Sequence, residues 1–310
     1  MNGIVPIHKP SGRTSHDVVE EIRRIPGIKK AGHTGTLDPL ATGVLPVCLN
    51  EATKLVQFLI QEPKSYRATM LLGVATDTLD IEGEIVERGD VDVRREDVES
   101  ALKSFSGTLR QKPPRYSAVK FRGKPLYKWT RRGIHVEPAP RIIEIYRIEI
   151  LDMDLPYVTF SVDCSAGTYI RSLCRDIGAK LGCPACLSGL VRTRNGPFRE
   201  DKAVSLEGFD TDEKKAILEK NMISIDEMLP HLSAVVVGES LACRLRSGLQ
   251  PTLEDIGDIH MPRVSAGDTV KFVSGDKRLI AVARMLYSSD EMRTVGLKKS
   301  LVKILRVFNH

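Results

Sequence analysis

The chain has 310 residues, 42% of them hydrophobic and 28% charged, a composition that is typical of globular proteins and leaves room for one large domain or two unequal ones. Its formal net charge of +6 permits a nucleic-acid partner without requiring one. The N-terminus has no basic stretch followed by an apolar one, and no run of 18 apolar residues occurs, so we expect a soluble, cytoplasmic protein with no membrane partner.

The first predicted elements are a strand over residues 3–8 and a helix over residues 15–25. Thr14 and Asp17 have the spacing of a capping box, and apolar residues then recur at helical intervals. The Pro-Gly pair directly after residue 25 ends this helix.

The next stretch, residues 32–44, reads Gly-His-Thr-Gly-Thr-Leu-Asp-Pro-Leu-Ala-Thr-Gly-Val. Its glycines let the main chain bend tightly and let a flat ligand come close. Pro39 disfavours the helical conformation for Asp38, so this carboxylate is expected on an extended or turn backbone. A carboxylate on a bent loop fits a nucleophile or a base, and His33 is a second potential proton carrier. On residue types alone, a purely structural turn explains the Asp-Pro pair as well.

The segments that follow are predicted to be a strand over 44–49, a helix over 51–60, a strand over 64–73, a polar loop over 75–84 and a short amphipathic helix over 98–105. Tyr66 begins the second of these strands, on the face whose later residues are apolar. The tyrosine is therefore either a core ring or a residue at the edge of a site.

Residues 110–135 differ from their surroundings, because they hold nine Lys or Arg, four large aromatic residues and no acid. Cations that meet phosphates and rings that stack on bases are typical of a nucleic-acid contact. We expect an inserted basic arm over about 110–137, whose backbone contacts are made by Lys120, Arg122, Lys124 and Lys128. The alternative is a solvated basic loop whose aromatic residues belong to the core.

Two strand-like segments, residues 142–151 and 158–164, come next. Gly-Thr-Tyr-Ile-Arg then leads into a helix with core spacing from residue 170, and Gly182 fits its C-terminal cap. Arg171 is expected to leave the face of this helix opposite the core.

The 6 cysteines are expected to be reduced and mostly buried. Cys183 and Cys186 have the spacing of half a zinc site or of a redox pair, but no second pair follows them. Free thiols are the favoured interpretation, and we expect no metal.

From about residue 234 the chain becomes a second unit of short strands, expected at 234–237, 269–273, 279–286 and 301–308 with turn residues between them. This pattern favours a small β barrel.

The motif His-x-Gly-Thr-Leu-Asp-Pro-x-Ala-x-Gly-Val-Leu resembles the active-site motif of the TruB-type tRNA pseudouridine synthases, which isomerise uridine 55 in the T-loop of tRNA. Pro-Pro-Arg-Tyr-Ser-Ala-Val-Lys, over residues 113–120, resembles the same family, and the stretch after 261 resembles a PUA domain, an RNA-binding pseudobarrel. The resemblance implies an α+β fold: a mixed-sheet synthase domain over 1–232 that carries the basic arm, and a PUA-like RNA-binding domain over 233–310.

By this resemblance Asp38 corresponds to the catalytic aspartate, and Tyr66 to the tyrosine that stacks on the flipped base and handles the C5 proton. Tyr169 and Arg171 correspond to the pair that orients the aspartate and the substrate, the guanidinium contacting the carboxylate. The remaining implied substrate contacts are His33, which stacks within the T-loop, Leu190, which packs on the uracil, and Lys9, which supports the backbone or binds a phosphate.

Isomerisation of uridine needs no redox change and no external group, so we expect no cofactor. The expected partner is the T-arm stem-loop of tRNA, bound by a monomer. Two alternatives stay open: a synthase subunit that takes its target from a guide RNA, and a non-catalytic RNA-binding protein or chaperone. The sequence also leaves open whether Asp38 attacks C1′ or C6.

Overall fold

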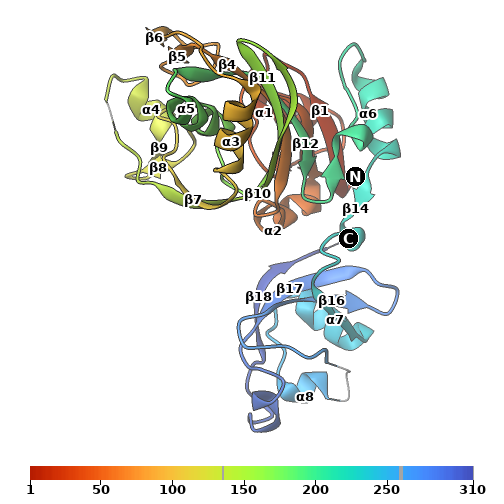
Figure 1. Cartoon of the computed structure of the whole chain (residues 1–310). Helices are drawn as coiled ribbons and strands as arrows, with labels where there is room; N and C mark the ends of the chain where they lie inside the picture. Colours follow the sequence, from red (N-terminus) through yellow and green to blue (C-terminus); the bar gives the residue numbers. More distant parts are fainter. Residues whose placement is uncertain (135, 258–260, 310) are drawn as a thin grey trace.

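The computed structural model describes residues 1–134, 136–257 and 261–309, and it divides into a larger unit and a smaller one below it in Figure 1. In the larger unit a ten-stranded sheet has the order β14-β1-β3-β12-β4-β11-β10-β7, and the short β2 and β13 pair with β3 and β12. The pair β3 and β12 is parallel and the other pairs are antiparallel, so the sheet is mixed as predicted. Its strands are β1 (Gly3–Lys9), β2 (Ala31–His33), β3 (Thr42–Leu49), β4 (Lys64–Leu72), β7 (Gly107–Gln111), β10 (Arg141–Asp154), β11 (Tyr157–Cys164), β12 (Ala185–Asn195), β13 (Phe198–Arg199) and β14 (Ile223–Ser224).

Helices pack on this sheet through apolar faces. They are α1 (Ser15–Arg23), α2 (Val56–Leu59) after a 3-10 turn over Asn50–Leu55, α3 (Arg95–Lys103), α5 (Ile170–Leu181) and α6 (Thr211–Lys220). The predicted capping box of Thr14 and Asp17 is present, and Gly182 ends α5 in the left-handed conformation with φ of 78°. The apolar face of each long helix therefore determines where it docks.

Several elements were not predicted. The polar loop over 75–84 carries part of a hairpin, β5 (Val74–Thr76) with β6 (Ile85–Arg88), and α6 lies where no helix was expected. The central strand β12 was not predicted either. β12 lies between β3 and β4 and buries polar as well as apolar side chains, so its sequence shows no simple apolar alternation.

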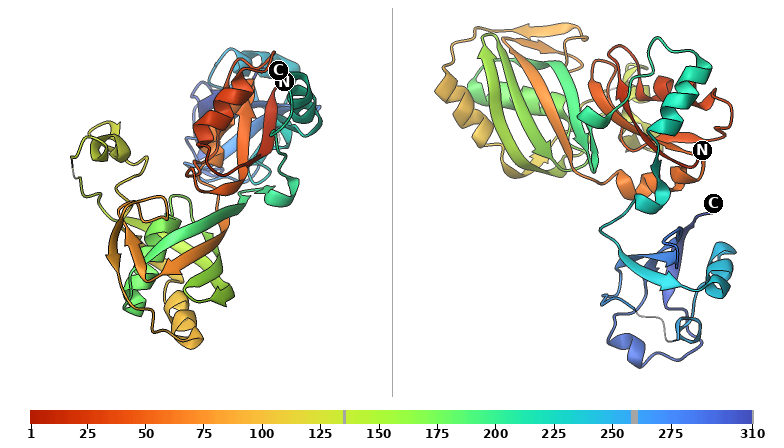
Figure 2. Two further views of the ribbon diagram at one scale, coloured as in Figure 1. Left: turned by 90° about the horizontal axis from the view of Figure 1, so that it is seen from above. Right: turned by 90° about the vertical axis from the view of Figure 1, so that its right-hand side faces the viewer.

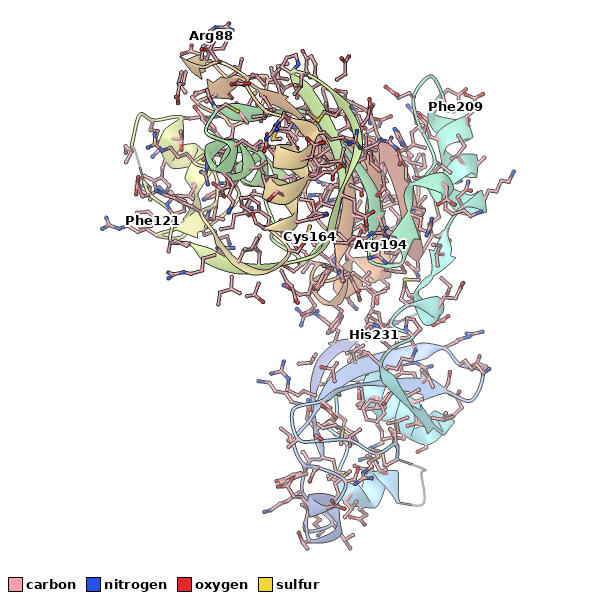
Figure 3. All side chains as sticks on the ribbon, viewed as in Figure 1. Arg88, Phe121, Cys164, Arg194, Phe209 and His231 are labelled. Carbon is pink, nitrogen blue, oxygen red and sulfur yellow. The ribbon has the colours of Figure 1, made fainter. Side chains whose placement is uncertain are left out.

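The predicted arm projects from the strand end of β7 beside α5 (Figure 1). It contains β8 (Lys120–Phe121), β9 (Lys124–Pro125) and α4 (Leu126–Thr130). Figure 3 places Phe121 on the outer side of the arm, away from the large sheet. His135, the last residue of the predicted basic segment, lies outside the described residues.

The smaller unit is a four-stranded sheet in the order β15-β16-β17-β18, flanked by α7 and α8. All four predicted strands are present: β15 (Ser233–Val237), β16 (Thr269–Ser274), β17 (Leu279–Met285) and β18 (Val302–Val307), with α7 (Glu239–Arg246) and α8 (Leu253–Ile256) as additions. The chain thus passes from one sheet to the other near residue 232.

The two units share an apolar cluster. Val44 and Cys48 of β3 belong to the same buried cluster as Leu279 and Phe308 of the smaller unit. Lys54 Nζ also donates a hydrogen bond of 2.9 Å to the carbonyl of Val307. The smaller unit therefore joins the larger one beside the 3-10 turn over Asn50–Leu55 and α2, and the side view in Figure 2 shows it below the larger unit.

The cysteines carry no disulfide among the described residues: five are buried and Cys243 is exposed. Burial raises the pKa of the Cys186 thiol to about 11, which keeps it protonated at neutral pH. Within the described ranges no group of three His, Cys, Asp or Glu residues is placed to hold a metal ion, and no helix is long and apolar enough to cross a membrane.

Candidate active site

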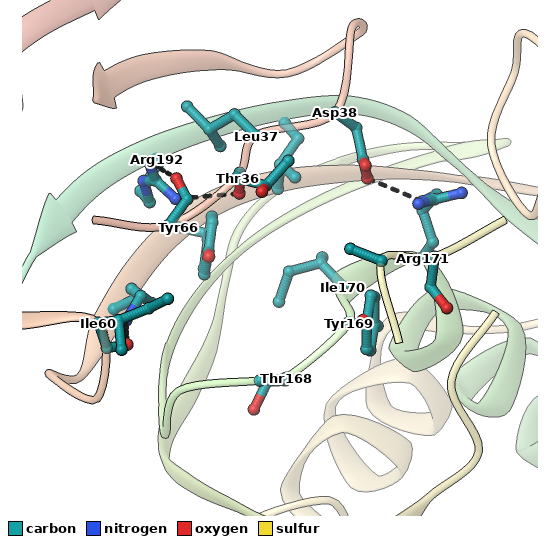
Figure 4. A pocket seen from close by; sticks show the side chains of 16 residues that line it. Thr36, Leu37, Asp38, Ile60, Tyr66, Thr168, Tyr169, Ile170, Arg171 and Arg192 are labelled. Atoms are coloured by element: carbon teal, nitrogen blue, oxygen red, sulfur yellow. Dashed lines mark hydrogen bonds and ion pairs between the residues drawn. The ribbon is translucent and has the colours of Figure 1, made fainter. Parts of the chain in front are cut away.

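One cavity of about 270 Å³ opens beside the loop between β2 and β3 (Figure 4). It is lined by Gly35, Thr36, Leu37, Asp38, Ile60, Lys64, Tyr66, Ser117, Ala118, Gly167, Thr168, Tyr169, Ile170, Arg171, Leu190 and Arg192. Five residues predicted for the site meet here, from four separate parts of the chain: Asp38, Tyr66, Tyr169, Arg171 and Leu190. His33 is not among the lining residues.

The loop that carries Asp38 is fixed at both ends. Ser15 Oγ donates to the carbonyl of Leu37 at 3.1 Å and accepts from its N–H at 2.8 Å. At the other end Gly43 has φ of +97°, and a Cβ there would lie 2.4 Å from the carbonyl oxygen of Arg192. Only glycine allows β3 and β12 to approach so closely, so this residue sets the path of the loop.

Asp38 and Arg171 point toward each other across the mouth of the cavity (Figure 4). Arg171 Nε lies 2.9 Å from Asp38 Oδ2 in an ion pair, the contact that the resemblance implied. The side chain of Arg171 is 6% exposed and that of Asp38 is 36% exposed. The carboxylate is thus open to a ligand while its partner is held inside the protein.

The expectation that Arg171 leaves the outer face of its helix is wrong. Its guanidinium is buried, and there it donates from Nη1 to the carbonyl of Thr78 at 3.1 Å and from Nη2 to that of Tyr116 at 3.0 Å. These acceptors lie in the hairpin loop and at the base of the arm, so Arg171 ties both segments to Asp38.

A second carboxylate, Asp80, faces Arg171 from the other side at 3.5 Å and was missed in the sequence. It is buried, and it accepts hydrogen bonds from Thr78 Oγ1 at 2.6 Å and from the N–H of Glu82 at 3.2 Å. The spacing of apolar residues in the sequence does not point to Asp80, because Asp80 lies in a polar loop that contacts β12 only in the folded chain.

Tyr66 lines the opposite side of the cavity and is 8% exposed. Burial raises the pKa of its phenol to about 12, while the charge and hydrogen bond of the Arg192 guanidinium act in the opposite sense. In the absence of a ligand the phenol is therefore protonated at neutral pH.

Arg192 is the second residue that sequence reasoning missed. It is fully buried, and its guanidinium donates to the carbonyls of Val44, Thr36 and Gly35 at 2.9, 3.3 and 3.1 Å. A signal was available: in Leu-Val-Arg, residues 190 and 192 lie on the same face of a strand, so the residue that faces Leu190's cavity could have been found.

Lys9 lies beneath the loop rather than in the cavity. Its ammonium is fully buried and donates to the carbonyls of Pro10, Arg13 and Pro39 at 2.7, 2.5 and 3.2 Å. Burial lowers the pKa of Lys9 to about 8. Of the two roles expected for Lys9, these contacts favour support of the backbone.

His33 is half-buried at the start of the same loop, and the N–H of Gly35 donates to its Nδ1 at 3.3 Å. Burial lowers the pKa of His33, so its imidazole is neutral at pH 7. A neutral ring at the rim of the loop can stack on a base, but it lies apart from the cavity.

The arm presents its cations to solvent. Lys120, Arg122, Lys124 and Lys128 are all exposed. Arg122 lies over the ring of Phe121 at 5.4 Å, and Lys124 over that of Trp129 at 5.9 Å. The four cations and the exposed ring form one positively charged surface, which fits the backbone of a nucleic acid.

The chain is similar to known proteins along its length. Residues 23–170 match the TruB family pseudouridylate synthase (N terminal domain), residues 171–235 the tRNA pseudouridylate synthase B C-terminal domain, and residues 259–308 the PUA domain. The tRNA pseudouridine synthase B of Syntrophus aciditrophicus is 49% identical, over 100% of this chain and 99% of the relative. That of Geobacter sulfurreducens is 42% identical over 100% of both.

Solved structures show the same fold. A Cbf5-Nop10-Gar1 complex contains a chain with a TM-score of 0.75 and 32% identity, matched over 99% of this chain and 85% of that one. A chain in the archaeal box H/ACA sRNP Nop10-Cbf5 complex has a TM-score of 0.75 and 30% identity, matched over 99% and 86%.

Proposed function

The chain belongs to the TruB family of pseudouridylate synthases, and on this premise we propose that it isomerises uridine 55 in the T-loop of tRNA with Asp38 as the nucleophile. The observation that carries the proposal is the ion pair of Asp38 with a buried arginine at the mouth of the cavity that also holds Tyr66. An accessible carboxylate with a fixed orientation is what nucleophilic attack on a sugar or a base requires.

The reaction breaks the bond from N1 of the uracil to C1′ of the ribose, turns the base and joins C5 to C1′. Asp38 attacks C1′ or C6 to open this sequence, and its ion pair with Arg171 orients the carboxylate. The freed base must stay between walls while it turns. Tyr66, Tyr169 and Leu190 supply aromatic and aliphatic walls in the same cavity.

When C5 is joined to C1′, its proton must leave so that the ring becomes aromatic again. Tyr66 is the group that we assign to this proton, because its phenol borders the cavity. Because its pKa is high, the phenol of the free protein is protonated at neutral pH and accepts a proton poorly. The step therefore depends on the acidity of the substrate carbon and on nearby charge.

Catalysis and substrate binding are assigned to different parts of the chain. We assign residues 1–232 to catalysis, the arm over about 110–137 to the RNA backbone, and residues 233–310 to additional affinity for tRNA. His33 then stacks within the opened T-loop, and Lys9 supports the loop from below. We assign the enzyme to the cytoplasm as a monomer, since one chain supplies Asp38, Tyr66 and Arg171 to the same cavity.

The alternative is a subunit that needs a guide RNA. It draws on the likeness to chains in H/ACA complexes, one of them described as bound to a substrate RNA, with a TM-score of 0.73 and 30% identity. The arm favours the stand-alone enzyme, because it gives the chain a cationic surface of its own for RNA.

The test is to incubate the purified chain with a bare T-arm stem-loop and to locate pseudouridine by sequence position. We expect conversion of uridine 55 alone, with no added RNA or protein. A matched stem-loop with cytidine at position 55 is the control and should remain unmodified at its other uridines. Conversion only after a guide RNA is added would support the alternative, and binding without conversion would support a non-catalytic protein.

A further inference from the structure

Arg192 is a buried cation that forms no ion pair with a carboxylate among the described residues. A buried charge without a counter-ion is costly, so the fold must gain something by keeping it there. A hydrophobic residue of similar volume at this position of β12 would fill the same space without that cost.

The guanidinium is fixed from three directions. Its Nε, Nη1 and Nη2 atoms donate to carbonyls at both ends of the loop that carries Asp38, those of Val44, Thr36 and Gly35. Because guanidinium is planar and its donors diverge, these three contacts fix its position and its plane. Arg192 also lines the cavity, where its side chain forms a hydrogen bond with that of Tyr66.

Tyr66 lies directly opposite Arg192. The two residues are paired in register between β4 and β12, and both line the cavity, so they share one face of the sheet. Directly opposed residues in an antiparallel pair have Cβ atoms about 4.5–5.5 Å apart. Figure 4 shows the tyrosine beside the arginine, on the side of the cavity away from Asp38 and Arg171.

The other charged and titratable groups around this pair leave its positive field in place. Lys64 lies on β4 and Cys164 on β11, while Asp38, which faces the cavity from the loop, is itself paired with Arg171. Lys9 and His33 on the far side of the loop are respectively a cation and a neutral ring. Asp38 and Cys164 act on the Tyr66 phenol in the same sense as burial, and Arg192 opposes them.

We propose that Arg192 is a positioning residue that acts through Tyr66, by stabilising the phenolate that accepts the proton from C5. This inference rests on the proposed function. In the step, the C5–H bond breaks and its electron pair forms the C5=C6 double bond. The N1=C6 pair moves onto N1, which takes a proton from solvent. The C5 proton joins the phenolate oxygen, and the resulting phenol returns it to solvent before the next turnover.

The electrostatics of the free protein agree with this role. Burial raises the pKa of Tyr66, and Arg192 is the group that most strongly opposes the rise. An opposite charge within about 4–6 Å favours the ionised form by roughly 10- to 1000-fold. Without Arg192, burial would act on the phenol with little to oppose it.

The test compares Arg192→Gln, which keeps hydrogen-bonding groups and loses the charge, with Arg192→Lys, which keeps the charge and loses the planar fork. One readout is single-turnover release of tritium from C5-labelled uridine 55. The second is rearrangement of a stem-loop with 5-fluorouridine at this position, because a C5–F bond cannot give up a proton and the reaction reports only the earlier steps.

We expect Arg192→Gln to slow tritium release by about 10- to 1000-fold while rearrangement of the fluorinated substrate changes by less than about threefold. Its rate of tritium release should rise about tenfold per pH unit between pH 6 and 9, parallel to the wild type and below it, because the phenol is protonated over this range in both proteins and the phenolate limits the step. Arg192→Lys should keep the wild-type ratio of the two rates, and it serves alone if the Gln variant does not fold.

Equal losses on both substrates, or a ratio that falls as far in Arg192→Lys as in Arg192→Gln, would reduce Arg192 to a support of the loop. Tyr66→Phe separates this failure from a failure of the proposed function. If the Phe variant still releases tritium at the wild-type rate, Tyr66 is not the base and both assignments fall. If the Phe variant is slow and the Arg192 variants are not, only the present inference is overturned.

Discussion

The cavity and the arm use the same residue types in opposite environments. Arg171 and Arg192 in the cavity are buried, and each is fixed by at least two backbone carbonyls. Lys120 and Lys128 of the arm are exposed and make no ion pair among the described residues. The two buried arginines can hold a reacting group in one place. The two exposed lysines can attract a negatively charged ligand but cannot fix its position.

This difference predicts two kinds of behaviour. A buried charge is screened little by salt and acts at one distance and angle, so its loss should lower a rate. An exposed charge is screened within about 10 Å at 0.1 M salt, so its loss should lower an affinity that depends on salt.

The largest effect is expected for Asp38→Asn. The amide keeps the size of the side chain and removes the anion, so the single-turnover rate should fall by about 10⁴-fold or more while the dissociation constant for tRNA changes by less than about threefold. The measurement is pseudouridine formation at saturating enzyme. Asp77→Asn, on an exposed carboxylate of the hairpin loop, is the control. A variant of Asp38 that keeps more than a tenth of the rate would remove it as the nucleophile.

Arg171→Lys should lower kcat by about 100-fold. Lysine keeps the charge, but a single ammonium cannot hold Asp38 and the carbonyls of Thr78 and Tyr116 together, and a small displacement of a reacting group costs that much. Steady-state kinetics of pseudouridine formation measure this loss of kcat. Arg175 lies on the same helix and, among the described residues, forms an ion pair only with Asp176, so Arg175→Lys should stay within about twofold of the wild type. Equal losses in the two variants would point to general damage to α5.

Replacement of Lys120, Arg122, Lys124 and Lys128 by Ala should weaken tRNA binding by roughly 10- to 100-fold and make the slope of log affinity against log salt shallower by about 3. Fewer released counterions explain both changes. A salt titration of binding measures the slope. The control replaces four exposed cations outside the arm, Arg94, Arg95, Lys103 and Lys220. An unchanged slope in the arm variant would mean that the arm faces solvent in the complex.

The smallest effect concerns Lys64, whose ammonium is buried and donates to the carbonyls of Ile60 and Glu62. Burial lowers the pKa of Lys64 to about 8. An unfolded lysine has a pKa of about 10.4, so between these values the unfolded state binds the extra proton and stability rises with pH. Below pH 8 both states are protonated and this contribution is constant.

The Lys64→Met variant has no such titrating group, so its stability lacks this increase with pH. The free energy of unfolding of the wild type relative to the variant should therefore increase by up to about 1.4 kcal/mol per pH unit between pH 8 and 10, and should stay constant between pH 6 and 7.5. Urea unfolding at each pH gives the difference. A flat difference across the whole range would contradict the assigned cost of burying this charge.

Sequence reasoning reached the parts of the molecule that local pattern determines. The helix after Thr14, the alternation from Tyr66 and the four strands after residue 232 each follow a period or a cap that a single segment contains. The resemblance supplied Asp38, Tyr66 and Arg171, and the fold brings them to one cavity.

The features that could not be predicted from the sequence depend on long-range packing. Asp80 becomes a partner of Arg171 only because the hairpin loop lies against β12, and β12 itself escaped notice because a central strand with a buried arginine has no simple alternation. Arg171 was placed outside because helical spacing shows which residues face the core, but not that a side chain in the first turn can reach a neighbouring loop. The cluster shared with the smaller unit likewise appears only in the fold.

The division between cavity and arm is tested most directly by measuring two quantities on two variants in parallel. These are the single-turnover rate at saturating T-arm stem-loop and the dissociation constant, for Asp38→Asn and for the fourfold arm variant. We predict that Asp38→Asn loses the rate and keeps the affinity, whereas the arm variant loses affinity and keeps a saturated rate within about threefold of the wild type. A saturated rate that collapses in the arm variant, or an affinity that collapses in Asp38→Asn, would contradict this account.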